Sequence, residues 1–270
     1  MLLLITSCIA PSPQPFLKVL DNQVRLNQTI GSLRFFVQSG CFDKIVICDS
    51  SSYQMNIDDV VDQSTSRQVC VEVLAFQGNT EMVRKLGKGY GEGEIMEYVL
   101  KNSRLMAGET YFFKVTGRLT VTNLRDIMPH LRPETNYFNI TVLKWLGAID
   151  TRFYGVCVST YRDDLLHAYR NVNDSEAKYY EICFRDMLLS KAVHFRCFPR
   201  FPIICGTSGT QGLDYSNKGL LFQYQRFTSI LGVHNTRLNA FIMLALDIPR
   251  LLWRRLRRAF LSNWRKRLVQ

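Results

Sequence analysis

The sequence lacks several short motifs that identify common classes of protein. Its eight cysteines form no CxxC pair and are scattered among apolar residues, which favours reduced, buried thiols over a metal site or a disulfide framework. No segment reaches the roughly 18 to 20 apolar residues of a membrane-spanning helix, and there is no internal repeat or low-complexity segment. The 270 residues are enough for one large globular domain or two small ones.

The start of the chain also lacks a feature of secretory signals, because no Lys or Arg precedes its short apolar run. We predict that this run, Leu2 to Thr6, is a buried strand. Similar runs predict strands at Lys44 to Cys48, Val69 to Phe76 and Tyr111 to Val115, and apolar spacing predicts helices at Asn22 to Gln38, Tyr161 to Arg170 and Lys178 to Ser190. This alternation predicts an α/β protein with a mostly parallel sheet flanked by helices.

Two polar residues, Asp49 and Ser50, follow the strand that begins at Lys44. Open parallel sheets bind ligands at the carboxyl ends of their strands, so Asp49 is well placed to accept hydrogen bonds from a ribose or a base. A turn or helix cap explains an Asp and a Ser after a strand equally well. The two interpretations stay open.

The strand Tyr111 to Val115 ends on Thr116, Gly117 and Arg118. An arginine just beyond a glycine at this end would project into a cleft, and its planar fork suits phosphate oxygens. A surface ion pair is the alternative. We predict that these three residues contact the phosphates of a ligand.

Alternate residues from Gly87 to Gly93 are glycines, but no GK[ST] closes the segment and no strand abuts it, as phosphate-binding fingerprints require. Backbone N–H groups near Gly89, together with Lys85 and Lys88, could still hold a diphosphate. Glu92 and Glu94 oppose this, because they would repel phosphate from the start of the following helix.

A carboxylate pair for a metal ion is not visible in the sequence. Asp150 is followed two residues later by Arg152, where a DxD motif would carry its second carboxylate. We therefore expect no cofactor, with Mg²⁺ or Mn²⁺ unsupported, and predict that Arg152 and other cations neutralise a diphosphate instead.

Glu181 is the best candidate for a general base. It lies on a largely apolar helix, where burial would raise the pKa of a carboxyl group, although an ion pair with Arg185 one turn later explains it equally well. Asp150 and His194 are the other candidates. A glycine-rich loop is predicted to act as a lid over the substrate that accepts the transferred group. It comprises Gly206, Thr207, Ser208 and Gly209.

Residues 247–270 hold eight Lys or Arg against one acid, so most of the formal charge of +11 lies there. On a helical wheel the apolar residues share one half and most cations the other, which is typical of a helix lying among lipid headgroups. Nucleic acid is a less favoured partner because the rest of the chain offers no second basic stripe. The predicted membrane residues are Arg250, Trp253, Arg254, Arg255, Arg257, Arg258, Phe260, Trp264, Arg265, Lys266 and Arg267.

Taken in order, the segments IVICDSS, GKGYGEGEIMEYVLKNS, FFKVTGRLTVTN, DTRFY, YYEICFRDML and PIICGTSGT resemble bacterial GT-A-type sugar-nucleotide glycosyltransferases of O-antigen and capsule synthesis. The resemblance implies a GT-A-like, Rossmann-like catalytic domain over residues 1–232 and a helical membrane-association segment over 233–270. It implies Asp49 at the nucleoside, Arg118 at the diphosphate and Glu181 at the acceptor hydroxyl.

The resemblance further implies a nucleotide-sugar donor, a lipid-linked glycan acceptor and peripheral attachment to the cytoplasmic face of the bacterial inner membrane. The departure from the pattern is TGR, which stands where many members carry DxD. The alternative function is a non-catalytic module that binds membranes or polyanions through its basic tail.

Overall fold

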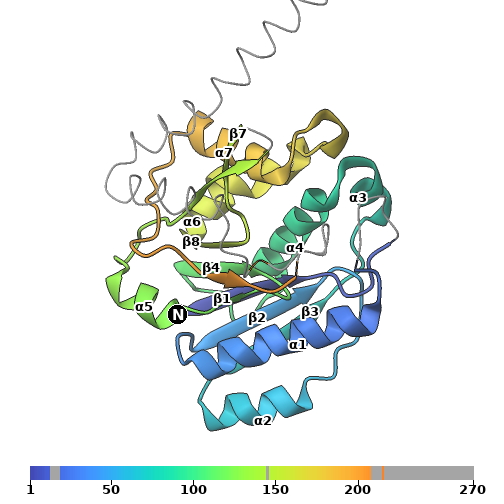
Figure 1. Cartoon of the computed structure of the whole chain (residues 1–270), viewed down its shortest axis with the longest axis vertical. Coiled ribbons are helices and arrows are strands. Elements are labelled where there is room, and N and C mark those ends of the chain that lie inside the picture. The colour runs from blue at the N-terminus through green and yellow to red at the C-terminus, as the bar shows by residue number, and fades with distance from the viewer. Residues whose placement is uncertain (13–18, 144–145, 208–214, 216–270) are drawn as a thin grey trace, which may run out of the picture.

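Four apolar runs of the sequence form the parallel part of a five-stranded sheet in the computed structural model, which describes residues 1–12, 19–143, 146–207 and 215 (Figure 1). The strand order is β3-β2-β1-β4-β8, and only β8 runs antiparallel to its neighbour β4. The strands are β1 (Leu2–Ser7), β2 (Lys44–Asp49), β3 (Cys70–Ala75), β4 (Tyr111–Thr116) and β8 (Phe153–Cys157). The predicted α/β class with a mostly parallel, helix-flanked sheet is confirmed.

The central strand, β1, has all six residues buried because helices cover both faces of the sheet (Figure 1). Leu3 and Ile5 face a core shared with α1 (Asn22–Ser39), whereas Leu2 and Leu4 face a core shared with α4 (Lys88–Asn102). The period of two along a strand separates these faces. The run is therefore apolar throughout, as a strand covered on both sides requires.

Helix α1 begins and ends at residues that satisfy its free backbone groups. The Asp21 carboxylate accepts hydrogen bonds from the backbone N–H groups of Gln23 and Val24, and Gly40 ends the helix in the left-handed region at φ +66°. The predicted helix from Asn22 to Gln38 is thus confirmed, and it extends one residue further, to Ser39.

The remaining elements are mostly short. They are α2 (Asp58–Ser66), α3 (Thr80–Leu86), β5 (Thr120–Val121), α5 (Leu124–Ile127), β6 (Ile140–Leu143), β7 (Leu146–Ile149), α6 (Val158–Thr160), α7 (Tyr180–Ser190), β9 (Ile204–Cys205) and single turns at Met128–His130 and Asp174–Glu176. The predicted regular helix from Tyr161 to Arg170 is wrong in detail, because a π-helical turn, Tyr161–Leu165, is followed by a 3₁₀ segment, Leu166–Asn171.

The structure corrects the interpretation of the glycine-rich segment as a loop. From Lys88 onward the segment lies inside α4, so it forms no phosphate-binding loop. The helix begins at Lys88, and Gly89 and Gly93 are buried on its face. A Cβ atom at Gly89 would lie 2.4 Å from the Tyr180 Cβ, and one at Gly93 would lie 2.1 Å from the Tyr169 Cβ. The glycines therefore allow α4 to pack closely against the segments that carry these tyrosines.

All eight cysteines are free thiols. Three are buried, as expected, whereas Cys70 is exposed on the edge strand β3. Within the described ranges, no helix is both long enough and apolar enough to span a bilayer.

Gly93→Ala is expected to lower the free energy of unfolding by about 1 to 3 kcal/mol, because the added methyl group overpacks the contact with Tyr169. Gly31→Ala on α1 is the matched control, since no atom lies within 4 Å of the added methyl group. There the better helix propensity of Ala should raise stability by about 0.5 to 1 kcal/mol. Urea unfolding measures both, and equal effects would contradict the packing role.

Candidate functional site

The carboxyl ends of β1, β2 and β4 lie side by side, and Asp49 occupies the end of β2. Its carboxylate is fully buried and accepts hydrogen bonds from the Ile9 N–H at 2.8 Å, the Ser51 N–H at 2.8 Å and the Ser51 hydroxyl at 2.5 Å. Asp49 thus ties the loop after β1 to the loop after β2. These donors support the turn-cap interpretation of Asp49, and contact of its carboxylate with a nucleoside stays a prediction.

Ser50 lies beside Asp49 but points its polar groups at the β1 end. Its backbone N–H donates to the Ser7 carbonyl at 3.0 Å and its hydroxyl does so at 3.4 Å. The side chain is half-buried. Ser50 therefore stays at the predicted edge.

Arg118 is placed by a close approach between the ends of β4 and β1. The Gly117 N–H donates to the Thr6 carbonyl at 2.6 Å, and a Cβ atom at Gly117 would lie 2.4 Å from that oxygen. Only glycine fits this contact. Arg118 then adopts a left-handed backbone with φ +70°, and its guanidinium donates to the Gln28 side chain of α1 at 3.4 Å.

A second guanidinium, that of Arg25, lies on the same side of the sheet. Arg25 is buried and donates to the Cys8 carbonyl, at 2.9 Å from Nε, and to the Val19 carbonyl at 3.1 Å. Burial, and to a smaller extent the positive charge of Arg25, together lower the pKa of Arg118 to about 10. The two side chains therefore share one desolvated, positive environment.

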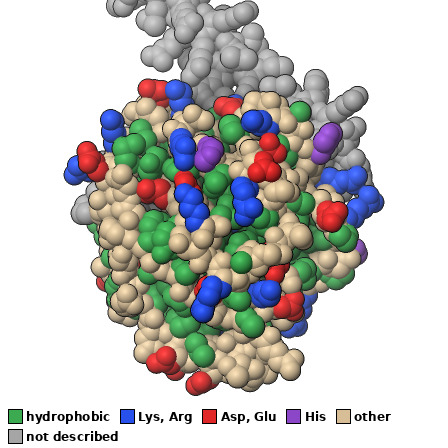
Figure 2. Space-filling view, turned by 180° about the vertical axis from the view of Figure 1, so that it is seen from behind, with side chains coloured by type: hydrophobic (Ala, Val, Ile, Leu, Met, Phe, Trp, Pro, Cys, Tyr) green, Lys and Arg blue, Asp and Glu red, His purple; other side chains and the backbone are tan. Residues whose placement is uncertain are grey.

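Neither arginine has an acidic partner within the part of the chain that the structure describes. Elsewhere the opposite charges are interspersed, as on the face in Figure 2. Arg25 is close enough to the buried Asp49 to feel its charge, but that carboxylate is occupied by backbone and hydroxyl donors. Two guanidiniums without a carboxylate at a strand end favour the binding of an anion.

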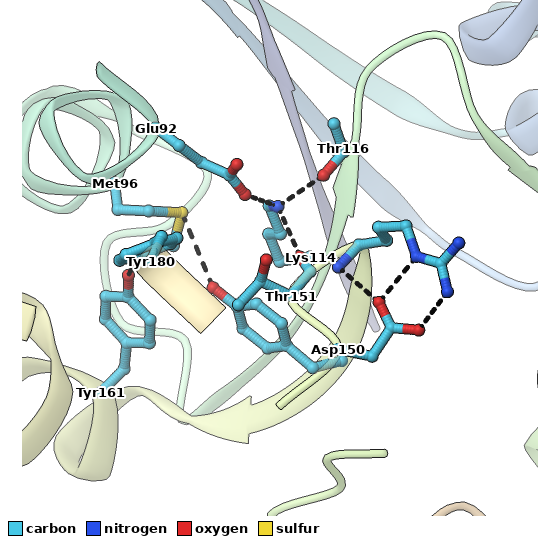
Figure 3. Close-up of polar contacts among 10 residues, drawn as sticks. Glu92, Met96, Lys114, Thr116, Asp150, Thr151, Tyr161 and Tyr180 are labelled. Carbon is cyan, nitrogen blue, oxygen red and sulfur yellow. Dashed lines mark hydrogen bonds and ion pairs between the residues drawn. The ribbon is translucent and has the colours of Figure 1, made fainter. Parts of the chain in front are cut away.

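Lys114, in the middle of β4, was not predicted as a site residue. Its ammonium group is fully buried and contacts the Glu92 carboxylate, the Thr116 hydroxyl at 2.9 Å and the Thr151 carbonyl at 2.8 Å (Figure 3). The network joins α4, the end of β4 and the loop between β7 and β8. In the sequence, the single charged residue inside the apolar run FFKVT could have indicated a buried functional or structural role for Lys114.

Asp150 and Arg152, in the loop after β7, form a bidentate ion pair. The Arg152 Nε donates to one Asp150 oxygen at 2.8 Å, and a terminal nitrogen donates to the other at 2.6 Å. Burial opposes the charge of Arg152, but Asp150 outweighs it and the pKa is raised. The guanidinium also lies over the Tyr215 ring, 4.7 Å from its centre. Asp150 is therefore engaged by Arg152, which makes it a poor general base.

Glu181, in the first turn of α7, is half-buried at the same edge. Burial raises the pKa of its carboxyl group; the positive charge of Lys88 opposes this, and the negative charges of Glu92 and Asp150 add to it. Among the described residues no ion pair joins Glu181 to Arg185, which instead pairs with Asp186 at 2.7 Å. The expected pKa shift is confirmed. Lys88 and Glu181 are thus brought together.

The first residues of the predicted lid lie beside Arg118. Gly206 follows β9, which pairs with β5, and a Cβ atom at Gly206 would lie 2.5 Å from the Arg118 carbonyl. The Tyr215 N–H donates to the Gly206 carbonyl at 3.0 Å. Thr207 is half-buried next to it, whereas Ser208 and Gly209 lie outside the described residues.

Two other predicted residues are not brought to this edge. His194 is exposed, and its carbonyl accepts from Asn136, which also binds Cys157 opposite the first residue of β4. It therefore lies at the opposite end of the sheet from Thr116, and we remove it from the site. Lys85 is exposed on α3, and no contact within the described ranges joins it to the residues above.

Within the described residues, no group of three or more His, Cys, Asp or Glu side chains could hold a metal ion. The predicted membrane residues, Arg250 to Arg267, and the whole segment 233–270 lie outside the described residues.

No protein-family model matches the chain, and no curated protein matches it. Among solved structures, it is similar to core-mannan synthase A from Aspergillus fumigatus in its Mn/GDP form, with 10% identity, 86% of each chain covered and a TM-score of 0.41. A second similar structure is the nucleoside-diphosphate-sugar pyrophosphorylase from Vibrio cholerae RC9, with 11% identity, 71% of this chain and 88% of that chain covered, and a TM-score of 0.39.

Lys114→Met is expected to lower the free energy of unfolding by about 3 to 5 kcal/mol, because it leaves the Glu92 carboxylate without its buried partner. Lys101→Met is the matched control, since Lys101 pairs with Glu97 at the surface and such pairs contribute about 0.5 kcal/mol or less. Chemical denaturation compares the two variants. Equal losses would show that the buried pair does not stabilise the fold.

Proposed function

We propose that the protein transfers a sugar from a nucleotide-sugar donor to an acceptor hydroxyl. One observation supports this most strongly: unpaired cations and a carboxylate with a raised pKa lie at the same edge of the sheet. Tyr215 connects them, because it lies within electrostatic range of Arg118 and its ring contacts Arg152. Arg152 in turn lies within electrostatic range of Glu181. An anionic leaving group and an acceptor hydroxyl fit the two halves of this arrangement.

The cations and the Glu181 carboxylate act in the same chemical step. Glu181 accepts the proton of the acceptor hydroxyl, the hydroxyl oxygen attacks the anomeric carbon, and the bond from that carbon to the diphosphate oxygen breaks. The charge that develops on the diphosphate is neutralised by Arg118 and by the field of Arg25. Gly117 contributes by bringing Arg118 to the strand end.

The finer proposal follows the resemblance to O-antigen and capsule glycosyltransferases. The acceptor is a lipid-linked or polysaccharide glycan, and the segment 233–270 holds the protein at the cytoplasmic face of the bacterial inner membrane. Its alternating basic and apolar residues support this, since each cation contributes roughly 1 kcal/mol near an anionic surface. A non-catalytic membrane or polyanion module is the second candidate, favoured by the same segment alone.

A thermal-shift screen with UDP, GDP and CMP distinguishes the two candidates. One nucleotide at about a hundredfold excess over its Kd should raise Tm by about 5 °C or more. Arg118→Ala should abolish both this shift and sugar transfer, because the phosphates lose their cation. Arg84→Ala, an exposed arginine on α3, is the control and should change neither.

The sugar-transfer assay also tests whether the reaction needs a metal ion. Addition of EDTA should leave transfer unchanged if arginines alone neutralise the diphosphate, whereas loss of activity restored by Mn²⁺ would contradict this. No shift with any nucleotide would leave the non-catalytic module as the better description.

Glu181→Gln is expected to lower kcat by about 10² to 10⁴ without loss of nucleotide binding, because the amide cannot accept the proton. A base acts only when ionised, so the raised pKa of Glu181 should place the loss of wild-type activity at a higher pH than the ordinary Glu pKa of about 4.3. The pH–rate profile measures this. Glu81→Gln, on the exposed start of α3, is the control, and full activity of the Glu181 variant would exclude the role.

A further inference from the structure

A basic groove lies outside the candidate site, between the turn at Met128–His130 and the segment after α7. It has a volume of about 380 Å³. Its charged lining comes from two parts of the chain that are more than sixty residues apart, and its other lining residues are Tyr137, Cys197 and Pro199. The basic residues are His130, Arg132, Arg196 and Arg200.

The floor of the groove is rigid. The Tyr137 hydroxyl accepts a hydrogen bond from the Arg132 backbone N–H at 2.9 Å, and Tyr137 forms a bridge with Arg196. The Tyr137 ring is stacked on Phe198, with centres 5.4 Å apart. The Arg196 backbone is held on both sides, by the Asn136 carbonyl at 2.9 Å and by the Phe138 N–H at 2.9 Å. The positions from which Arg132 and Arg196 project are therefore set before any ligand arrives.

The three arginines are not neutralised within the described part of the chain. No ion pair or side-chain hydrogen bond joins Arg132, Arg196 or Arg200 to another described residue, and Glu134, two residues from Arg132, forms none with them. Two exposed arginines elsewhere, Arg104 and Arg170, do pair with carboxylates. A fixed, open groove with three guanidiniums and no carboxylate is built to attract an anion.

We infer that this groove binds a phosphate group, separately from the candidate site. Guanidinium groups bind the oxygens of a phosphate through paired hydrogen bonds, and the groove has room for a diphosphate. Two sources share this chemistry, a lipid headgroup and a soluble phosphate compound. The inference does not rest on the proposed sugar transfer.

The groove is also within reach of the candidate site. The chain from Arg200 runs to Gly206, which contacts Arg118, and six residues span at most about 22 Å. A ligand held by its phosphate in the groove could therefore extend along this segment to the edge that carries Arg118.

The test compares two triple variants of the full chain, both made in an Arg118→Ala background that removes the candidate anion site. The groove variant is R132Q/R196Q/R200Q. The control variant, R67Q/R84Q/R162Q, removes the same charge from exposed arginines outside the groove. Calorimetric titration with inorganic pyrophosphate tests a soluble source, and sedimentation with phosphatidylglycerol/phosphatidylcholine vesicles tests a headgroup. Thermal unfolding confirms that both variants fold.

The groove variant should lose at least about tenfold in affinity in one arm or both, because hydrogen bonds to charged groups contribute about 1.5 to 3 kcal/mol each. The control should stay within about twofold of its background. Loss for pyrophosphate alone identifies a soluble ligand, and loss for vesicles alone identifies a headgroup. If groove and control variants lose binding equally in both arms, only overall charge matters and the inference is wrong.

Discussion

The buried ammonium group of Lys114 is the constraint on which the candidate site depends. A lysine without solvent must be neutralised and given hydrogen-bond acceptors, so α4, the end of β4 and the loop after β7 are drawn to one point through Glu92, Thr116 and Thr151. The strand end that leads to Arg118 and the loop that carries Arg152 are thereby held in fixed positions. A structural ion pair thus underlies a site that does not use it directly.

Two kinds of cation therefore occur in this molecule. Lys114 and Arg152 are satisfied by carboxylates and hold the framework together. Arg25 and Arg118 are desolvated without a carboxylate, and their mutual repulsion helps to keep the pKa of Arg118 low. The first kind stabilises the fold, whereas the second kind keeps binding free energy available for an anionic ligand.

Much of the candidate site could be predicted from the sequence because strand ends in a parallel sheet share an edge. The structure brings the predicted residues Arg118, Arg152 and Glu181 to one edge, since each follows or begins a strongly patterned element, and their roles there stay predictions. Asp49 could not be assigned, because an aspartate after a strand serves equally well as a cap and only its backbone partners decide between the roles. The basic groove was missed because its residues are far apart in the chain.

By itself, the sequence determined the buried strands, the long helix α1 and the α/β class, because apolar periodicity reports which faces are covered. Only the tertiary structure decided what the glycines of α4 do. A glycine such as Gly93 fits a loop and a close helix contact equally well in the sequence, and the contact with Tyr169 decides between them. It also decided which charges are paired. Pairing depends on distances between segments, and local pattern carries no information about those distances.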